Sequence, residues 1–249
     1  TGLGLIRHVV VRAVDGRLMI TIVINGKTLP HANELIDALS AGFKQFSLFL
    51  NINERNDNVI LTDEYVCIYG KKTTISSDLG IKFEIGPGSF MQVNDGVRRK
   101  LYQDALKAAQ ITPDTTVIDA YSGAGMLTAI FATKAKKAVG IEIVKEAVDC
   151  ANDLKIRNGL DNKMENVNAP CETALPEVLR KVRSEGGDCV LVLDPPRQGV
   201  DETLIETIKE SKPDRILYIS CSPQTLARDV GLLTGTLVRD GEKLSKSDG

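Results

Sequence analysis

The chain has 249 residues, a formal net charge of −2 and a hydrophobic content of 43%. This composition is typical of a globular protein with its own apolar core, and it excludes a disordered or fibrous chain. Every apolar run is shorter than the ~18 residues that a membrane helix needs. The near-neutral charge also lacks the basic footprint that most nucleic-acid-binding domains carry.

The cysteines and histidines are too few and too scattered for a disulfide framework or a metal site. The five cysteines are odd in number and form no Cys-x-x-Cys pair, and the two histidines, His8 and His31, lie far apart. This pattern is typical of proteins in a reducing compartment. We therefore expect a cytoplasmic protein that binds no metal and does not enter a membrane.

Residues 1–88 are predicted to form a small α+β domain with a mostly antiparallel sheet. Short apolar runs rich in β-branched residues are separated by turn signals such as Asp15-Gly16. Helical spacing over residues 33–39 follows Pro30, which is a helix-start signal. The loop Gly86-Pro87-Gly88 marks the predicted boundary. The apolar runs lie at residues 9–11, 18–24, 46–52, 59–61 and 66–68.

Residues 89–249 are predicted to form a second, α/β domain. An amphipathic helix over 95–110 precedes a regular alternation of strands and helices, which indicates a parallel sheet covered on both faces. In such a sheet the reacting groups lie at the carboxyl ends of the strands. The predicted strands are 116–119, 138–143, 165–168, 189–193 and 215–219. The predicted helices that alternate with them are 126–133, 145–158, 175–184, 202–211 and 225–233.

A glycine-bearing turn after the first of these strands indicates a cofactor site. Gly123 lets the backbone approach a ligand, and Glu142 ends the next strand about 20 residues on, where an acid takes ribose hydroxyls. Thr128 stands where a dinucleotide fingerprint needs its third glycine, and Asp119 would repel a pyrophosphate. The spacing favours a cationic ligand such as S-adenosylmethionine over a dinucleotide. The alternative is a tight turn that binds nothing.

Two further motifs stand at strand ends. Residues 194–197 read Asp-Pro-Pro-Arg, and residues 220–225 read Ser-Cys-Ser-Pro-Gln-Thr. A cysteine at the carboxyl end of a strand, just before a proline-marked turn into a helix, lies where an open sheet places a nucleophile. We expect Cys221 to be reactive. The other four are expected to be small buried hydrophobic residues, namely Cys67, Cys150, Cys171 and Cys189.

Four motifs in order resemble the bacterial RNA uracil-5 methyltransferases. They are Ser-Phe-Met-Gln-Val-Asn at 89–94, Val-Ile-Asp-Ala-Tyr-Ser-Gly-Ala-Gly at 117–125, Asp-Pro-Pro-Arg-Gln-Gly at 194–199 and Ser-Cys-Ser-Pro-Gln-Thr-Leu-Ala-Arg-Asp at 220–229. The chain is most similar to the 23S ribosomal RNA branch, with the transfer-RNA enzyme as its neighbour. The resemblance extends across nearly the whole chain.

The resemblance implies a Rossmann-like, S-adenosylmethionine-dependent methyltransferase sheet preceded by a small α+β domain. It implies RNA as the partner, ribosomal rather than transfer RNA, and methylation at C5 of a uridine. The nucleophile of the family falls on Cys221, whose thiolate would add to C6 of a uracil that has been extruded from its stack. The cofactor contacts of the family fall on Gln92, Tyr121, Glu142 and Asp194. Asp119 and Gly123 of the glycine turn complete the predicted cofactor set.

The chain also departs from the family pattern. The N-terminal RNA-binding barrel, the iron–sulfur cysteines of many members, and the C-terminal segment with the general-base glutamate have no counterpart here. Pro170 stands near the third strand, where a polar cofactor contact is expected. We therefore expect a C-terminally truncated sheet without its last two strands, able to add to RNA but not to turn over. The alternatives are a non-catalytic RNA-binding fragment and a small-molecule methyltransferase, and the second leaves Cys221 unexplained.

Overall fold

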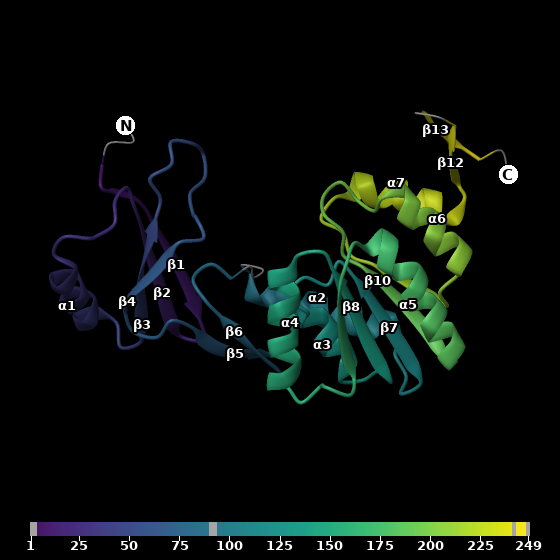
Figure 1. Cartoon of the computed structure of the whole chain (residues 1–249), viewed down its shortest axis with the longest axis horizontal. Helices are drawn as coiled ribbons and strands as arrows, with labels where there is room; N and C mark the ends of the chain where they lie inside the picture. The colour runs from purple at the N-terminus through teal and green to yellow at the C-terminus, as the bar shows by residue number, and fades with distance from the viewer. Residues whose placement is uncertain (1–3, 90–93, 241–242, 248–249) are drawn as a thin grey trace. The chain divides into compact units, whose positions relative to one another are not determined.

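The computed structural model describes residues 4–89, 94–240 and 243–247. The chain divides into two compact units. The first consists of Thr1–Ser77 with Phe83–Val93, and the second of Asp78–Lys82 with Asn94–Gly249 (Figure 1). The limits of the two domains predicted from the sequence, 1–88 and 89–249, remain a prediction. Among the described residues no helix is long and apolar enough to cross a bilayer.

The first unit contains a four-stranded sheet in the order β1-β2-β3-β4. β1 and β2 form an antiparallel hairpin whose turn uses Asp15 and Gly16, both at positive φ. β2 and β3 are parallel, joined by a crossover through α1, and β3 pairs antiparallel with β4. The bounds are β1 Ile6–Val14, β2 Arg17–Ile24, α1 Ala32–Gly42, β3 Phe46–Ile52 and β4 Tyr65–Tyr69.

The predicted strand at residues 59–61 is wrong, because these residues lie in the loop between β3 and β4. The buried side chain of Asn53 donates to the carbonyls of Val59 and Ile60, at 2.8 and 3.0 Å. Asn51, also buried, donates to the carbonyl of Thr62 at 2.8 Å and accepts from the Thr62 N–H at 3.0 Å. These amides supply the hydrogen bonds that a neighbouring strand would otherwise provide, so an apolar run becomes a fixed loop.

A hairpin of β5 (Thr74–Asp78) and β6 (Ile81–Ile85) is a second difference from the sequence-based prediction. β5, Thr-Ile-Ser-Ser-Asp, contains no apolar run, and the apolar residues of β6, Ile-Lys-Phe-Glu-Ile, alternate with charged ones. The tip of the hairpin carries Leu79 and Gly80, both at positive φ. The tip residues Asp78–Lys82 belong to the second unit.

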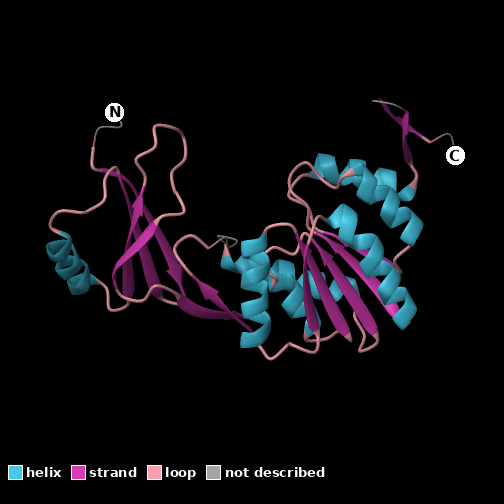
Figure 2. Ribbon diagram, in the orientation of Figure 1, coloured by secondary structure: helices cyan, strands magenta, loops and turns pink. Residues whose placement is uncertain are grey.

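The second unit is built on a five-stranded parallel sheet in the order β11-β10-β7-β8-β9. All five predicted strands are confirmed, and so are the helices between them (Figure 2). The strands are β7 Thr115–Ala120, β8 Lys137–Glu142, β9 Met164–Asn168, β10 Asp188–Leu193 and β11 Arg215–Tyr218. The helices are α2 Asp95–Ala109, α3 Met126–Ala132, α4 Lys145–Arg157, α5 Cys171–Glu185, α6 Glu202–Ser211 and α7 Pro223–Thr234.

Helices cover both faces of this sheet, which explains why the central strands are apolar throughout. Ile118 and Leu191 pack with α5, α6 and α7 in one core cluster. On the opposite face Asp119 reaches α3, and α4 contacts β8 and β9. This is the predicted Rossmann-like arrangement, and it aligns the carboxyl ends of the strands along one edge.

Two short strands after α7 were not predicted. β12 (Leu237–Asp240) and β13 (Lys243–Lys246) pair antiparallel and form a sheet of their own in the described part of the chain. This segment is largely polar and contains no long apolar run, so the sequence does not indicate these strands. Leu237 nevertheless packs on the core cluster beneath α6 and α7, so the ladder is attached to the second unit.

Candidate active site

The strand register brings the predicted site residues to one edge of the parallel sheet. Ala120, the last residue of β7, is level with Ile141 of β8 and with Leu193 of β10. Leu193 is in turn level with Tyr218, the last residue of β11. The segments that follow these positions therefore meet at this edge. They carry Tyr121, Gly123, Glu142, Asp194 and Cys221, whereas Gln92 lies outside the described residues.

The loop after β7 turns sharply because three of its residues adopt left-handed backbone conformations. Tyr121, Gly123 and Gly125 have φ values of 67°, 53° and 77°. A bulky residue such as tyrosine is rare there and costs about 1–3 kcal/mol, so the surroundings must hold it in place. A Cβ at Gly125 would lie 2.7 Å from Cβ of Ala151, whereas a Cβ at Gly123 would meet nothing within 4 Å. The space beside Gly123 is therefore open to a ligand.

Glu142 connects this loop to the end of β8. Its carboxylate accepts hydrogen bonds from the backbone N–H of Gly123 at 3.0 Å and of Val144 at 2.8 Å. Each carboxylate oxygen keeps a further lone pair, which suits a hydroxyl donor. The carboxylate is thus fixed in orientation and still able to accept from a ligand.

Two residues beside Glu142 were missed by the sequence analysis. Asn168, the last residue of β9, donates to the carbonyls of Glu142 and Ile143, both at 3.0 Å. Ile143 directly follows Glu142 and is 64% exposed, so its side chain offers apolar surface beside the carboxylate. The signal that would have found both is their position, since each stands at the carboxyl end of a strand.

Asp119 lies within β7 and is only 1% exposed. The hydroxyl of Thr128 on α3 donates to its carboxylate at 2.5 Å. Burial raises the pKa of Asp119 to about 7, the carboxylates of Asp194 and Glu142 add to this, and the Thr128 hydrogen bond opposes it. Thr128, which stands where a dinucleotide site has its third glycine, is therefore the hydrogen-bond donor to a buried carboxyl group.

Tyr121 packs against the core cluster beneath α5 and α6. Burial raises the pKa of its phenol well above the usual value, and Cys171, Glu172 and Asp201 contribute in the same direction. Its hydroxyl is therefore protonated at neutral pH. The left-handed backbone of Tyr121 thus turns the chain out of the sheet while the ring remains partly buried.

Asp194 directly follows β10 and is accessible to solvent. The surrounding protein nevertheless displaces enough water to raise the pKa of its carboxyl. The chain then turns through Pro196 and Gly199, joined by a hydrogen bond of 2.8 Å between the Gly199 N–H and the Pro196 carbonyl. Arg197 stands exposed in this turn.

Cys221 is exposed in the short connection between β11 and α7. Ser220 holds this connection through its Oγ, which donates to the carbonyl of Ser222 at 2.9 Å and accepts from its N–H at 3.0 Å. Ser222 caps α7 by accepting from the N–H of Thr225, and Pro223 follows as a helix-starting residue. The thiol therefore lies in a fixed turn at a helix N-terminus.

Of the other four cysteines, two are buried, one is half-buried and one is exposed. Cys171 and Cys189 are buried, and burial raises the pKa of their thiols to about 12 and about 11. Cys67 is half-buried. The expectation that Cys150 is buried is wrong: the apolar stripe of α4 runs through Val148, Ala151 and Leu154, and Cys150 lies off it.

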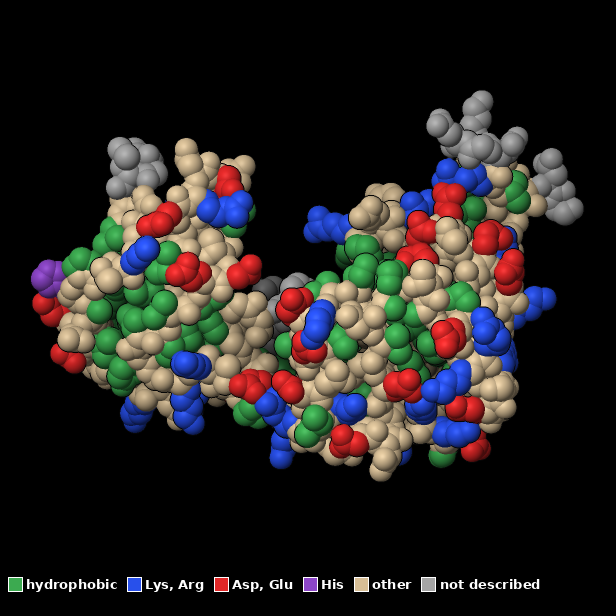
Figure 3. All heavy atoms as spheres, in the orientation of Figure 1, with side chains coloured by type: hydrophobic (Ala, Val, Ile, Leu, Met, Phe, Trp, Pro, Cys, Tyr) green, Lys and Arg blue, Asp and Glu red, His purple; other side chains and the backbone are tan. Residues whose placement is uncertain are grey.

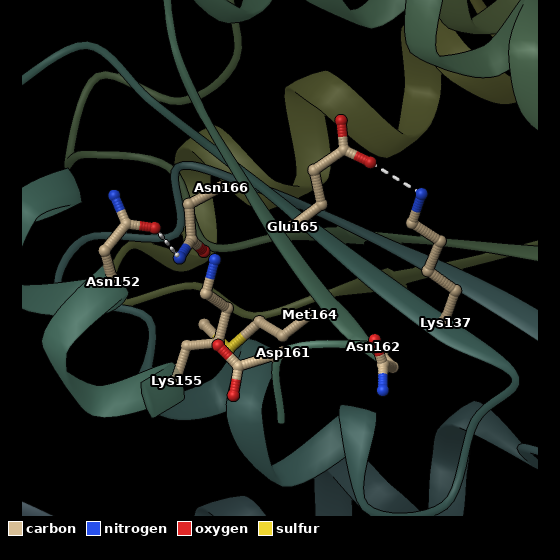
Figure 4. Close-up of a pocket in the computed structure, with 8 residues that line it drawn as sticks. All are labelled: Lys137, Asn152, Lys155, Asp161, Asn162, Met164, Glu165 and Asn166. Carbon is tan, nitrogen blue, oxygen red and sulfur yellow. Dashed lines mark hydrogen bonds and ion pairs between the residues drawn. The ribbon is translucent and has the colours of Figure 1, made fainter. Parts of the chain in front are cut away.

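A hollow of about 290 Å³ lies beside the edge strand β9, away from these residues (Figure 4). Residues near the beginnings of β8 and β9 line this hollow, and most of its lining side chains are polar. Lys137 pairs with Glu165 at 2.6 Å, and Asn166 donates to Asn152 at 2.9 Å. Among the described residues there is no group of three or more His, Cys, Asp or Glu that would hold a metal.

The parallel sheet, its glycine turn and the carboxylates at its edge define the fold of the S-adenosylmethionine-dependent methyltransferases. Such an enzyme from Agrobacterium tumefaciens superposes with a TM-score of 0.56 over 93% of this chain and 79% of its own, at 12% identity. The Pyrococcus abyssi tRNA (uracil-54, C5)-methyltransferase in complex with S-adenosyl-L-homocysteine superposes with a TM-score of 0.70, at 25% identity, over 92% of this chain and 54% of its own.

The tRNA (Uracil-5-)-methyltransferase family matches residues 10–240, and the chain belongs to this family. An RNA methyltransferase of Clostridium tetani is 38% identical over 234 residues, which are 92% of this chain and 50% of the relative. One of Caldanaerobacter subterraneus is 41% identical over 237 residues, which are 93% of this chain and 51% of the relative. The chain thus spans about half the length of these curated relatives.

Proposed function

We propose that this chain carries the methyltransferase part of an RNA uracil-C5 methyltransferase and that Cys221 is its nucleophile. One observation carries the proposal: an exposed thiol is held in a fixed turn at the sheet edge where Asp194 and the glycine turn also end. Membership of the uracil-5 methyltransferase family supports it.

The residues at the edge fit S-adenosylmethionine. Carboxylate lone pairs of Glu142 suit ribose hydroxyls, the open space at Gly123 admits a ligand against the backbone, and exposed Ile143 offers an apolar surface for a purine ring. The carboxylates of Asp194 and Glu142 favour a cation over a phosphate. When bound, this cofactor supplies an electrophilic methyl group.

In the proposed reaction the Cys221 thiolate forms a bond to C6 of the uracil, and the electron pair of the C5–C6 double bond moves toward C5 and O4. C5 thereby becomes nucleophilic. After C5 is methylated, a general base takes the C5 proton, the electron pair of that C–H bond restores the C5–C6 double bond, and the carbon–sulfur bond breaks to release the thiolate. The target base must leave its stack to reach Cys221 at the sheet edge.

We propose ribosomal RNA as the substrate, because the sequence motifs resemble that branch most. Transfer RNA is the competing substrate, since the matching family and the Pyrococcus abyssi neighbour are both described as acting on it. Figure 3 shows acidic and basic side chains interspersed over the drawn face of the second unit.

The test uses RNA in which 5-fluorouridine replaces uridine, because fluorine at C5 cannot leave as a proton and the covalent adduct persists. The chain is incubated with S-adenosylmethionine and either a ribosomal or a transfer RNA, and adducts are counted on a denaturing gel. We expect an adduct that requires the cofactor and is lost in Cys221→Ser. Cys150→Ser, at the other exposed cysteine, is the matched control and should change nothing.

An adduct that persists in Cys221→Ser would contradict the assignment of the nucleophile. RNA binding without an adduct would favour the alternative, a non-catalytic RNA-binding fragment. The relative yields with the two RNAs decide between ribosomal and transfer RNA.

A further inference from the structure

Asp229 is a fully buried carboxylate that the reaction described above does not use. It lies on α7, near the end of the motif that begins with Ser220, and it is 0% exposed. A buried carboxylate is unfavourable unless hydrogen bonds or a cation compensate for its lost hydration. Its contacts therefore indicate what it holds together.

Three groups bind the two oxygens of Asp229. Oδ2 accepts from the backbone N–H of Val200 at 2.8 Å and from the phenol of Tyr218 at 2.5 Å. Oδ1 accepts from Nε of the neighbouring Arg228 at 2.7 Å. Burial and the Asp229 carboxylate both raise the pKa of Tyr218, so its phenol remains a donor at neutral pH.

Arg228 extends this arrangement along the same loop. Its Nη2 donates to the carbonyl of Gln198 at 2.7 Å, so Arg228 and Asp229 hold the loop at two points, Gln198 and Val200. Gly199 lies between them at φ 85°, where a Cβ would collide with both the guanidinium and the carboxylate. Only glycine lets the loop approach α7 this closely.

The two segments that Asp229 joins each carry a residue of the candidate site. The loop held at Gln198 and Val200 begins with Asp194 and contains Arg197. Tyr218 is the last residue of β11, three positions before Cys221. Among the described residues, Asp229 thus hydrogen-bonds to both segments through one carboxylate oxygen.

We propose that Asp229 is a positioning residue that fixes the Asp194 loop and the Cys221 turn relative to each other. The inference deepens the proposed function and rests on it for the chemical step. A displacement of about 1 Å in a reacting group lowers a rate about 100-fold. Gly123 and Glu142 lie on other strands, and S-adenosyl-L-homocysteine lacks the positive sulfonium that the Asp194 carboxylate would favour, so the Kd for this ligand should change little when Asp229 is lost.

The first measurement is amide hydrogen exchange in this chain and in the variants Asp229→Ala, Asp229→Asn and Tyr218→Phe. In Asp229→Ala we expect the Val200 amide to exchange at least 10-fold faster, with amides of β8 and α4 unchanged. The exchange rate of the Val200 amide in Asp229→Asn should lie between those of the wild type and Asp229→Ala, since the side-chain amide oxygen of this variant can still accept the Val200 hydrogen bond. Tyr218→Phe should accelerate exchange at residues 219–222 and leave Val200 protected. Glu206→Gln, an exposed acid on α6 that pairs with Lys209, is the control.

The second measurement is the rate of adduct formation with 5-fluorouridine RNA as a function of RNA concentration. We expect Asp229→Asn to lower the maximal rate 10- to 100-fold, with less than a 3-fold change in the half-saturating RNA concentration and in the Kd for S-adenosyl-L-homocysteine. A purely structural role would instead lower stability and accelerate exchange throughout the sheet.

Unchanged Val200 exchange in Asp229→Ala, or exchange accelerated equally everywhere, would overturn the proposal. If Asp229→Ala does not fold, Tyr218→Phe decides, because it removes one hydrogen bond and keeps the buried ring. If the wild-type chain forms no adduct, the proposed function fails on its own, whereas the exchange pattern still tests whether Asp229 fixes the two segments.

Discussion

At the scale of single residues, Asp119 makes the stability of the second unit depend on pH. Burial raises the pKa of this carboxyl to about 7 in the folded chain, well above that of an exposed aspartate. Between about pH 4 and pH 7 the folded state therefore binds more protons than the unfolded state. The stabilisation of the folded state that comes from the protonated Asp119 carboxyl is fully present at low pH and is lost as the pH rises toward 7.

We predict that Asp119→Asn removes this dependence, because the amide is neutral at every pH. The free energy of unfolding of the variant, relative to the wild type, should increase from pH 4 to pH 8 by up to about 4 kcal/mol, since one pKa unit corresponds to about 1.4 kcal/mol. Urea unfolding at a series of pH values measures it.

Thr128→Ser is the matched control for this series, because it retains the hydroxyl that donates to Asp119. It should keep the pH dependence of the wild type. A difference between Asp119→Asn and the wild type that is the same at pH 4 and pH 8 would show that Asp119 is ionised throughout.

At the scale of elements, a buried ion pair fixes the tip of the β5–β6 hairpin to α2. Asp78 and Arg98 are 2% and 4% exposed. Oδ2 of Asp78 lies 2.9 Å from Nε of Arg98, and Oδ1 of Asp78 lies 3.3 Å from Nε of Arg99. Arg98 also contacts Asp95 at 2.7 Å. Removing one partner of a buried pair is costly because the other charge remains desolvated.

We predict that Asp78→Ala lowers the free energy of unfolding of the second unit by about 3 kcal/mol. The control is Asp104→Ala on the same helix, which breaks the exposed pair with Lys100 and should cost at most about 0.5 kcal/mol. Chemical denaturation measures both. Equal losses in the two variants would mean that Asp78 and Arg98 remain hydrated and that the hairpin is held by its apolar contacts instead.

At the scale of the whole molecule, the two units have separate apolar cores. Leu48 belongs to the cluster formed by β2, β3 and α1, and Leu191 belongs to the cluster beneath α5, α6 and α7. Both side chains are fully buried. Units with independent cores need not unfold in one cooperative transition.

We predict two calorimetric transitions that respond separately to core truncation. Leu48→Ala should lower the midpoint of one and Leu191→Ala that of the other, each with a loss of about 2–5 kcal/mol in the affected unit. A single transition that shifts in both variants would show that the units unfold together. The outcome also bears on the predicted domain limits, 1–88 and 89–249.

The sequence by itself determined the parallel sheet of the second unit and the helices that alternate with its strands. Its strands are continuous apolar runs because both faces of the sheet are covered, and its helices have their own period, so local pattern was sufficient. It also located Glu142, Asp194 and Cys221, because a polar residue at the end of an apolar strand, or within a few positions after it, must stand at the sheet edge. The family was recognisable from motifs of this kind.

Only the tertiary structure decided what distant side chains do to the backbone. Asn53 turns an apolar run at residues 59–61 into a loop, and Asp229 on α7 binds Val200 in a loop and Tyr218 at the end of β11. Asp78, at the tip of the β5–β6 hairpin, pairs with Arg98 of α2. Each of these depends on a hydrogen bond or ion pair between residues that become neighbours only after folding, and no local pattern in the chain encodes that proximity.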